Sequence, residues 1–382
     1  MLASKGLPGR VVELPESTRT AIEAARAIGC ELGQIVKSLV FQTRETTRPI
    51  LVLVSGKNRV DEAMLSNFVG EPLARADPEF VRSVSGYAIG GVPPVGLTTA
   101  IPTYVDYDLL ELSELWAAAG HPHAVCRLTP NELLDLTNGS PVPVYPLPLS
   151  ATDKAAWVTF DCYGTLIDWQ RGLLEQLDHL APTRADPARL FSAYLREEKA
   201  LEAGPYMPYR QLMAEAVRRA ARSEGFDVSS EAAKAVPDSI RGWPPFGDTR
   251  DSLSALASEG YRIGVLSNID NDLLTLTLQN LNLEADCVVT AEDVRSYKPA
   301  FNHWIRFLKQ TGQQPEGVLH VSGSIEYDID SSRRLGFRTA YVARYGDAAA
   351  GSAAGFSVRD LAELVRRLRQ KPKESVDLRH KK

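Results

Sequence analysis

The chain has 382 residues, of which 44% are hydrophobic and 24% are charged, with a formal net charge of −5 at pH 7. This length allows two or three domains with substantial cores. The charge gives no sign of a dominant nucleic-acid-binding surface, although a local basic groove is compatible with it. The four cysteines stand far apart without a CxxC pair, which argues against a disulfide scaffold and for a reducing compartment. No uninterrupted apolar run reaches about 18 residues, and no early apolar segment follows a basic start, so we expect a soluble cytoplasmic protein without a membrane partner.

Helical and strand patterns mix in the first 150 residues. Residues 18–28 have helical spacing, with Ser17 as a candidate N-cap and Gly29 as a stop. Apolar runs at 35–43 and 49–55 predict strands in the core of a sheet. We therefore expect a mixed α/β fold for this part of the chain.

Proline-rich stretches mark the later portion of this first part. After a helix predicted at 60–69, residues 86–96 form a loop dense in glycine and proline, which is expected to be rigid. Residues 141–148 (PVPVYPLP) have neither a helical nor a strand period and predict an extended interdomain linker. We place the first domain at 1–148 and a linker at 149–154.

From residue 155 onwards, short apolar strands alternate with helical stretches, which predicts a doubly wound parallel sheet. The predicted strands are 158–160, 261–266, 285–289, 318–322 and 339–342. The helical stretch 172–245 between the first two strands is too long for a crossover. We interpret it as a helical cap inserted into a core formed by 155–171 and 246–345. The domain is expected to end at residue 370, before a basic tail at 371–382.

Polar residues follow the predicted strands of this second domain at several points. Because the carboxyl ends of neighbouring parallel strands meet at one edge of a sheet, these residues are expected to share one active site. They are Asp161 with Thr165, Ser267 with Asn268, Lys298, and Ser324 with Asp328.

These residue types suit the steps of a displacement reaction. A buried aspartate at a strand end, here Asp161, can act as a nucleophile that forms an ester intermediate. Ser267 and Asn268 can donate hydrogen bonds to an anionic group of the substrate. Lys298 can hold Asp161 ionised and offset developing negative charge. Asp328 can hold Lys298, position the hydrolytic water or bind Mg²⁺ beside Asp161.

In this order and spacing, the four pieces resemble motifs I to IV of the haloacid dehalogenase-like (HAD) hydrolase superfamily, over residues 155–370. The phosphatase branches of that superfamily carry a second aspartate two residues after the nucleophile, which protonates the leaving alcohol. Tyr163 stands at that position here. The run Asp-Cys-Tyr-Gly-Thr is instead similar to L-2-haloacid dehalogenases, whose aspartate displaces halide from C2 without a metal. That branch implies a basic cap residue that binds halide or carboxylate, for which Arg196 is the candidate.

Departures from the dehalogenase pattern keep a second branch open. Ser322-Gly323-Ser324 stands where phosphatases have Gly-Asp-Ser, but the asparagine of the dehalogenase pattern is also absent, and Trp304 replaces a tyrosine. The alternative is a phosphatase that acts on a small phosphate ester with Mg²⁺ held by Asp161 and Asp328. The dehalogenase interpretation requires no cofactor and no metal. The residues expected to bind substrate are Tyr163, Arg196 and Ser324.

Three blocks of the first domain resemble the YbaK/prolyl-tRNA synthetase-associated editing domain family. They are residues 33–40 (GQIVKSLV), the Gly/Pro loop 86–96, and residues 117–133, which contain AAAGHPH and LTPNEL. The resemblance implies hydrolysis of the ester bond of a mischarged aminoacyl-tRNA. Such a reaction needs no protein nucleophile when water or a substrate hydroxyl attacks.

By this resemblance Lys37 is catalytic and contacts the terminal nucleotide or its phosphate. The loop presents backbone N–H groups to the aminoacyl carbonyl. The substrate-binding residues that it implies are Gly90, Gly91, Pro93, Gly96 and His121. The alternative is a non-catalytic module that binds tRNA ends or nucleotides.

The sequence therefore predicts a two-domain α/β hydrolase. A mixed α/β editing domain is followed by a Rossmann-like HAD core with a helical cap. The expected partners are a small acid substrate and, at the first domain, aminoacyl-tRNA. The dehalogenase resemblance is also compatible with a homodimer.

Overall fold

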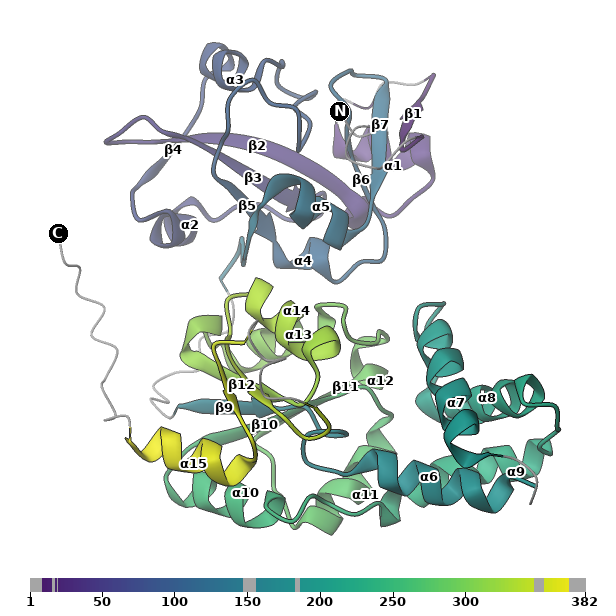
Figure 1. The fold of residues 1–382 in the computed structure, drawn as a ribbon. Coiled ribbons are helices and arrows are strands. Elements are labelled where there is room, and N and C mark those ends of the chain that lie inside the picture. Colours follow the sequence, from purple (N-terminus) through teal and green to yellow (C-terminus); the bar gives the residue numbers. More distant parts are fainter. Residues whose placement is uncertain are drawn as a thin grey trace. The chain divides into compact units, whose positions relative to one another are not determined.

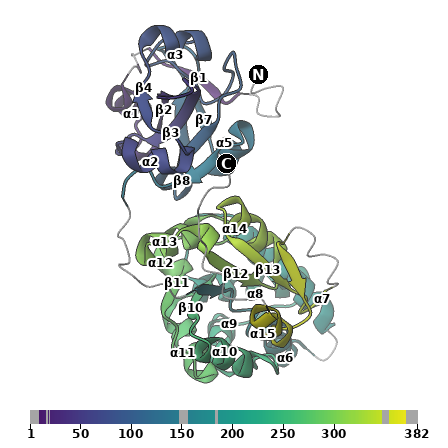
Figure 2. The same cartoon turned by 90° about the vertical axis from the view of Figure 1, so that its left-hand side faces the viewer.

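The computed structural model describes residues 9–15, 18, 20–146, 156–182, 186–346 and 354–370. The chain divides into two compact units, Met1–Leu149 and Ser150–Lys382, each with its own sheet (Figures 1 and 2). The predicted N-cap Ser17, the linker 149–154 and the basic tail 371–382 lie outside the described residues.

The N-terminal unit is built on a mixed sheet (Figure 1). In its described residues the strand order is β1-β7-β6-β2-β3-β5-β8, with β4 paired to β2. The strands are β1 Val11–Glu13, β2 Ile35–Thr43, β3 Pro49–Ser55, β4 Leu73–Arg75, β5 Thr103–Asp106, β6 Leu115–Ala118, β7 Ala124–Leu128 and β8 Ser140–Val142. Strands β2 and β3 have the predicted bounds. Strand β3 is central in the sheet, and its continuous apolar run is buried after the first residue.

Short capped helices surround this sheet. They are α1 Ala21–Ile28, α2 Glu62–Val69, α3 Pro78–Ser85, α4 Tyr107–Leu110 and α5 Pro130–Thr137. Helix α1 begins later than predicted, because Thr20 is its N-cap and forms a capping box with Glu23. Gly29 ends the helix as predicted, with a left-handed φ of 77° that glycine adopts without steric cost.

The prediction of a continuous linker over 141–148 was wrong at its start. Ser140–Val142 form β8, which pairs in parallel with β5. Pro141 is tolerated there because β8 is the last strand of the sheet, where a missing N–H interrupts no ladder. Val142 is buried in the apolar cluster of the unit, which holds the strand in place.

The C-terminal unit contains a parallel sheet of order β11-β10-β9-β12-β13-β14 within the described residues. The strands are β9 Trp157–Phe160, β10 Arg262–Ser267, β11 Cys287–Thr290, β12 Val318–Ser322, β13 Arg338–Val342 and β14 Phe356–Val358. The first five correspond to predicted strands. Strand β14 was missed, because a three-residue run has too little pattern to be distinguished from a loop.

Helices cover both faces of this sheet, with α13 and α14 on one face and α10, α11 and α15 on the other (Figures 1 and 2). The helices are α6 Trp169–Leu180, α7 Pro187–Glu202, α8 Tyr209–Ser223, α9 Ser230–Ala235, α10 Thr249–Ser258, α11 Asn271–Leu281, α12 Ala291–Val294, α13 Asn302–Thr311, α14 Asp330–Arg334 and α15 Leu361–Gln370. This arrangement confirms the predicted doubly wound core.

The regular elements described between β9 and β10 are all helices, as predicted for the cap. Helices α7 and α8 pack together, and their inward residues, such as Tyr194, Met213 and Val217, belong to the same buried apolar cluster as Phe160 of β9. The cap and the core of this unit are therefore held together by continuous apolar packing.

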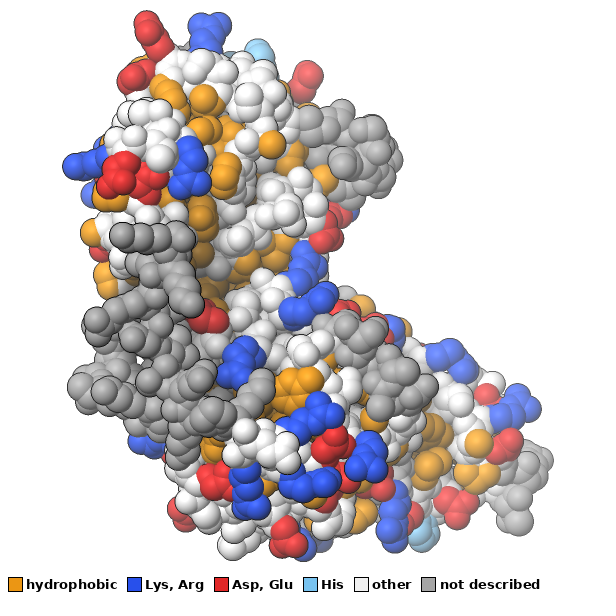
Figure 3. Space-filling view, turned by 60° about the vertical axis from the view of Figure 1, so that its left-hand side comes forward, with side chains coloured by type: hydrophobic (Ala, Val, Ile, Leu, Met, Phe, Trp, Pro, Cys, Tyr) orange, Lys and Arg blue, Asp and Glu red, His pale blue; other side chains and the backbone are white. Residues whose placement is uncertain are grey.

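Charged side chains of both signs are interspersed on the face of the C-terminal unit that Figure 3 shows. None of the helices in the described ranges is both long and apolar enough to cross a membrane.

Candidate active sites

Asp161 lies at the carboxyl end of β9, between the ends of β10 and β12. A tight turn follows, in which the N–H groups of Leu166 and Ile167 donate to the carbonyl of Cys162. The turn brings Thr165 back to the aspartate, and its hydroxyl donates to Asp161 Oδ2 at 2.8 Å. The strand-turn-helix sequence thus fixes one carboxylate oxygen by a local contact.

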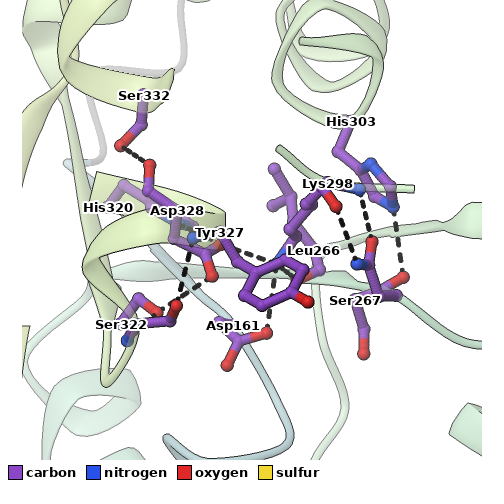
Figure 4. A network of polar contacts seen from close by, with 12 residues as sticks. Asp161, Leu266, Ser267, Lys298, His303, His320, Ser322, Tyr327, Asp328 and Ser332 are labelled. Carbon is purple, nitrogen blue, oxygen red and sulfur yellow. Dashed lines mark hydrogen bonds and ion pairs between the residues drawn. The ribbon is translucent and has the colours of Figure 1, made fainter. Parts of the chain in front are cut away.

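Lys298 connects the pieces that come from distant parts of the chain (Figure 4). Its ammonium group donates to Asp161 Oδ1 at 3.1 Å, Asp328 Oδ1 at 2.6 Å and the carbonyl of Leu266 at 2.6 Å. The side chain is only 1% exposed. Burial alone would lower the pKa of Lys298, but the two carboxylates outweigh this effect and raise it. All three N–H donors are therefore in use, and the lysine remains charged.

Asp328 is the more firmly ionised of the two carboxylates. Besides Lys298, it accepts hydrogen bonds from His320 Nε2 at 3.0 Å and Ser322 Oγ at 3.0 Å. Burial opposes its charge, but Lys298 and the hydrogen bonds lower its pKa to about 2. For Asp161 the balance is reversed: burial is the largest effect, only partly offset by Lys298, and raises its pKa to about 6. Asp328 thus acts as a fixed counter-ion, and Asp161 is the group that titrates.

The donor set at this centre does not fit Mg²⁺. Mg²⁺ requires near-octahedral oxygen ligands, and the ammonium of Lys298 stands between the two carboxylates that would supply them. Tyr163 stands at the position where the phosphatase branches carry a second aspartate. Its hydroxyl is hydrogen-bonded to the hydroxyl of Thr277 at 2.7 Å. In the ranges that the structure describes, no three His, Cys, Asp or Glu side chains cluster as metal ligands would.

A cavity of about 390 Å³ opens onto Asp161. The predicted site residues in its wall are Asp161, Tyr163, Ser267, Asn268, Lys298, Ser324 and Asp328. Asn268 also fixes the Lys298 backbone, since its Oδ1 accepts the N–H of Lys298 at 2.7 Å. The hydroxyl of Ser324 accepts the N–H of Tyr327 at 3.1 Å and so starts the helical turn Ile325–Ile329 that carries Asp328.

Arg196 does not line this cavity, which corrects its predicted role. It is exposed on α7 and borders a shallow surface depression with Arg189 and Glu224. The face of α7 towards the cavity carries Leu195, Glu198 and Glu202 instead, which are spaced by three and four residues. The sequence does not single out the two glutamates, because charged residues occupy several successive positions of this helix.

A second cavity, of about 800 Å³, lies in the N-terminal unit. Lys37 of β2 and Gly90 line it, together with Asn58 and Arg59. The ammonium of Lys37 donates to the carbonyl of Asn58, and burial lowers the pKa of this lysine. The side-chain amide of Asn58 in turn donates to Asp106 at 2.7 Å and Asp108 at 3.0 Å. No local sequence motif indicates that Asp106 and Asp108 hold the side chain of Asn58 in this way.

The other predicted residues of this unit do not line its cavity. Gly91 and Gly96 take part in the loop itself: the N–H of Gly91 donates to Ala88 at 3.0 Å, and the carbonyl of Gly96 accepts Tyr87 Oη at 3.2 Å. Pro93 is buried beside them. His121 is exposed in the turn between β6 and β7. These residues shape loops, and only Gly90 of the predicted set reaches the cavity with Lys37.

Comparisons with known proteins match the two units to two different families. Residues 15–136 match the aminoacyl-tRNA editing domain family and residues 156–336 match the haloacid dehalogenase-like hydrolase family. The N-terminal part is 30% identical over 125 residues to the putative Cys-tRNA(Pro)/Cys-tRNA(Cys) deacylase EbsC of Enterococcus faecalis, covering 32% of this chain and 76% of that protein. The chain joins an aminoacyl-tRNA editing domain to a HAD-like hydrolase domain.

The HAD-like domain has its own relatives. It is 25% identical over 196 residues to an (S)-2-haloacid dehalogenase of Pseudomonas putida, covering 50% of this chain and 86% of that enzyme. The solved structure of L-2-haloacid dehalogenase from Xanthobacter autotrophicus matches with a TM-score of 0.51 and 22% identity, covering 57% of this chain and all of that one. At this level of identity, the structural match establishes the fold.

Substitution of Lys298 by Met is expected to lower the free energy of unfolding of the HAD-like domain by about 3–5 kcal/mol, because two buried carboxyl groups lose their counter-charge. Denaturant unfolding at pH 7, followed by tryptophan fluorescence, measures this change. The matched control is Lys199→Met, whose ion pair with Glu326 is 62% exposed on both sides and contributes at most about 1 kcal/mol. A loss in Lys298→Met no larger than in the control contradicts the central role of this lysine.

Proposed function

We propose that the HAD-like domain hydrolyses an L-2-haloacid, or a related small acid, through an ester on Asp161. The observation that carries this proposal is the pairing of a buried nucleophile with Lys298 at a cavity where Tyr163 replaces a second aspartate. A halide leaves with its electron pair and needs no proton, so the absence of that acid suits this leaving group. The (S)-2-haloacid dehalogenases among the relatives support the same reaction.

The reaction proceeds in two steps. The carboxylate of Asp161 attacks C2 of the substrate, a C–O bond forms, and the C–halogen bond breaks with its electrons on the halide. Water then attacks the Asp161 carbonyl carbon of the ester, releasing the 2-hydroxy acid, a proton and the regenerated carboxylate. The ammonium of Lys298 offsets the negative charge on Asp161 in both steps.

Two polar groups in the same cavity are suited to the substrate carboxylate. Within the described structure, the buried hydroxyl of Ser267 has no hydrogen-bond partner, and it lines the cavity beside Asn268. A bound carboxylate gives the hydroxyl the acceptor that a buried donor requires.

Halide release from L-2-chloropropionate in EDTA is expected for the full chain, with a fall of at least about 10³-fold in Asp161→Asn, because the nucleophile is removed. Chloride is measured directly, and Asp178→Asn, an exposed position of α6, is the matched control. Release that survives in Asp161→Asn excludes this mechanism. If the wild type releases no halide, a Mg²⁺-dependent screen of phosphate esters tests the phosphatase alternative.

The rate of this reaction is expected to increase with pH through about 6. Burial raises the pKa of Asp161 from 3.8 to about 6, and only the ionised form attacks carbon. Below this value kcat/KM falls about tenfold per pH unit, as the fraction of ionised Asp161 decreases. A pH profile of kcat/KM for halide release checks this, and constant activity down to pH 4.5 contradicts it.

We further propose that the editing domain hydrolyses the ester of a mischarged aminoacyl-tRNA. Its family and the position of Lys37 in the wall of a large cavity support this function. An ammonium group there is suited to a phosphate or ribose oxygen of the terminal nucleotide. Cys-tRNA(Pro) is the first candidate substrate, because the relative EbsC is a putative Cys-tRNA(Pro)/Cys-tRNA(Cys) deacylase.

Lys37→Ala is expected to slow release of cysteine from Cys-tRNA(Pro) by at least about 100-fold, because it removes the ammonium group proposed to contact the terminal nucleotide. The control Lys57→Ala alters a neighbouring lysine that pairs with Asp108 at 3.2 Å and does not line the cavity. Deacylation of radiolabelled Cys-tRNA(Pro) is the measurement. Wild-type protein that binds tRNA without deacylating any mischarged form supports the non-catalytic alternative.

A further inference from the structure

The cavity over Asp161 contains a second pair of carboxyl groups, which displacement of a halide does not use. Glu198 and Glu202 reach its wall from one face of α7. One oxygen of Glu198 accepts hydrogen bonds from the hydroxyls of Tyr194 at 2.7 Å and Tyr209 at 2.8 Å. Glu198 is thus satisfied within the cap, whereas Glu202, one helical turn further along, lies nearer to the residues at the strand ends.

The groups that contact Glu202 do not offset the negative charge that its ionised form would carry. Its carboxyl accepts the amide of Asn268 at 3.4 Å and is hydrogen-bonded to the hydroxyl of Tyr327. Of the cations that line the cavity, Lys298 is committed to Asp161 and Asp328, and Lys199 pairs with the exposed Glu326. Desolvation in the cavity wall, followed by the charge of Glu198, raises the pKa of Glu202 to about 8. At neutral pH this carboxyl therefore carries a proton.

A separate observation shows that the same cavity is built for a polar ligand. Ser267 lines the cavity, and its buried hydroxyl has no hydrogen-bond partner in the described residues. A ligand oxygen at Ser267 places the ligand within the cavity that Asp161 and Glu202 share. The nucleophile, a proton donor and a hydrogen-bond donor for a substrate carboxylate then all face one small molecule.

The proton on Glu202 selects among leaving groups. A nitrogen or oxygen atom leaves carbon readily only if it receives a proton as the bond breaks. A carboxylate does not displace such an atom from an unstrained saturated carbon, whereas release of ring strain in a three- or four-membered heterocycle makes the displacement favourable. A phosphate ester is less suitable here, because the two lysines that line the cavity are already paired with carboxylates and the donor set does not fit Mg²⁺.

We propose that Glu202 is the general acid for hydrolytic ring opening at this site, with a small carboxylic acid bearing a strained nitrogen or oxygen heterocycle as substrate. The proposal rests on the proposed role of Asp161 as the nucleophile. Asp161 forms a C–O bond to a ring carbon, the ring C–N or C–O bond breaks with its electrons on the heteroatom, and Glu202 gives that atom its proton. Water then hydrolyses the ester, returning one proton to Glu202, so that one water is added to the ring overall.

The test compares two reactions of the full chain on three substrates that share a small 2-substituted acid framework. Oxirane-2-carboxylate and aziridine-2-carboxylate report ring opening, and L-2-chloropropionate reports halide release. Glu202→Gln keeps the shape and hydrogen bonding but removes the acidic proton, so ring opening is expected to fall by at least about 100-fold. The ratio of ring opening to halide release is expected to fall at least tenfold. Glu197→Gln, on the same helix but outside the cavity and 4.0 Å from Arg219, is the matched control.

Each outcome separates this inference from the proposed function. Equal losses of both activities in Glu202→Gln assign a merely structural role and overturn the inference. Wild-type protein that releases halide but opens neither ring also overturns it and leaves the dehalogenase proposal intact. Ring opening that persists in Asp161→Asn overturns the role of the nucleophile. A wild type that acts on none of the three acids rejects both proposals.

The pH profile of the wild type provides a readout that does not depend on a folded variant. Ring opening is expected to rise through about pH 6 with Asp161 and to fall above about pH 8 as Glu202 loses its proton, whereas halide release shows no fall near pH 8. The groups that face Glu202 are Glu198, Asn268, Lys298, Tyr194, Tyr297 and Tyr327, and burial raises the pKa values of the three tyrosines far above this range. Equal ring-opening rates at pH 7 and pH 9.5 overturn the proposal.

Discussion

The ammonium group of Lys298 is the interaction on which the HAD-like site depends. It joins carboxylates that lie 167 residues apart in the chain, Asp161 after β9 and Asp328 after β12, and also the end of β10 through the carbonyl of Leu266. A charge at this depth is costly unless every partner is present. The parallel order β10-β9-β12 supplies those partners, because it brings three strand ends to one edge of the sheet. The same contacts give the two acids different charge behaviour. Asp328 stays ionised, because its pKa is lowered to about 2, whereas the pKa of Asp161 is raised to about 6.

The cap decides which reaction such a nucleophile can carry out. The core contributes Asp161 and Lys298, and the cap contributes the face of α7 that carries Glu198 and Glu202. An arginine in this wall suits an anionic leaving group, whereas a protonated glutamate suits a leaving atom that needs a proton. Because Arg196 lies outside the cavity, the cavity wall differs in chemistry as well as in geometry from the wall that the sequence predicted.

The ester hydrolysis proposed for the two domains proceeds in different ways. In the HAD-like domain the proposed ester forms on the protein itself, at Asp161, and water cleaves it afterwards. In the editing domain the proposed substrate already contains the ester, and the cavity provides Lys37 and loop backbone rather than a nucleophile. Asn58 links this lysine to Asp106 and Asp108, so that the editing site also depends on a charge held by surrounding polar groups.

The sequence by itself determined the family of each domain, the strands with long apolar runs, and the set of polar residues that meet at the strand ends of the HAD-like core. Asp161, Ser267 and Asp328 could be predicted because parallel strands must end at one edge, which makes residues distant in the chain neighbours in space. The tertiary structure alone decided which face of the cap helix α7 meets the cavity, and the charge states of the acids. Charges on successive residues of α7 do not reveal which face meets the cavity, so Arg196 was chosen where Glu202 lies. Strand β8 and the different pKa values of the two aspartates likewise depend on burial and on distant partners, which no local pattern contains.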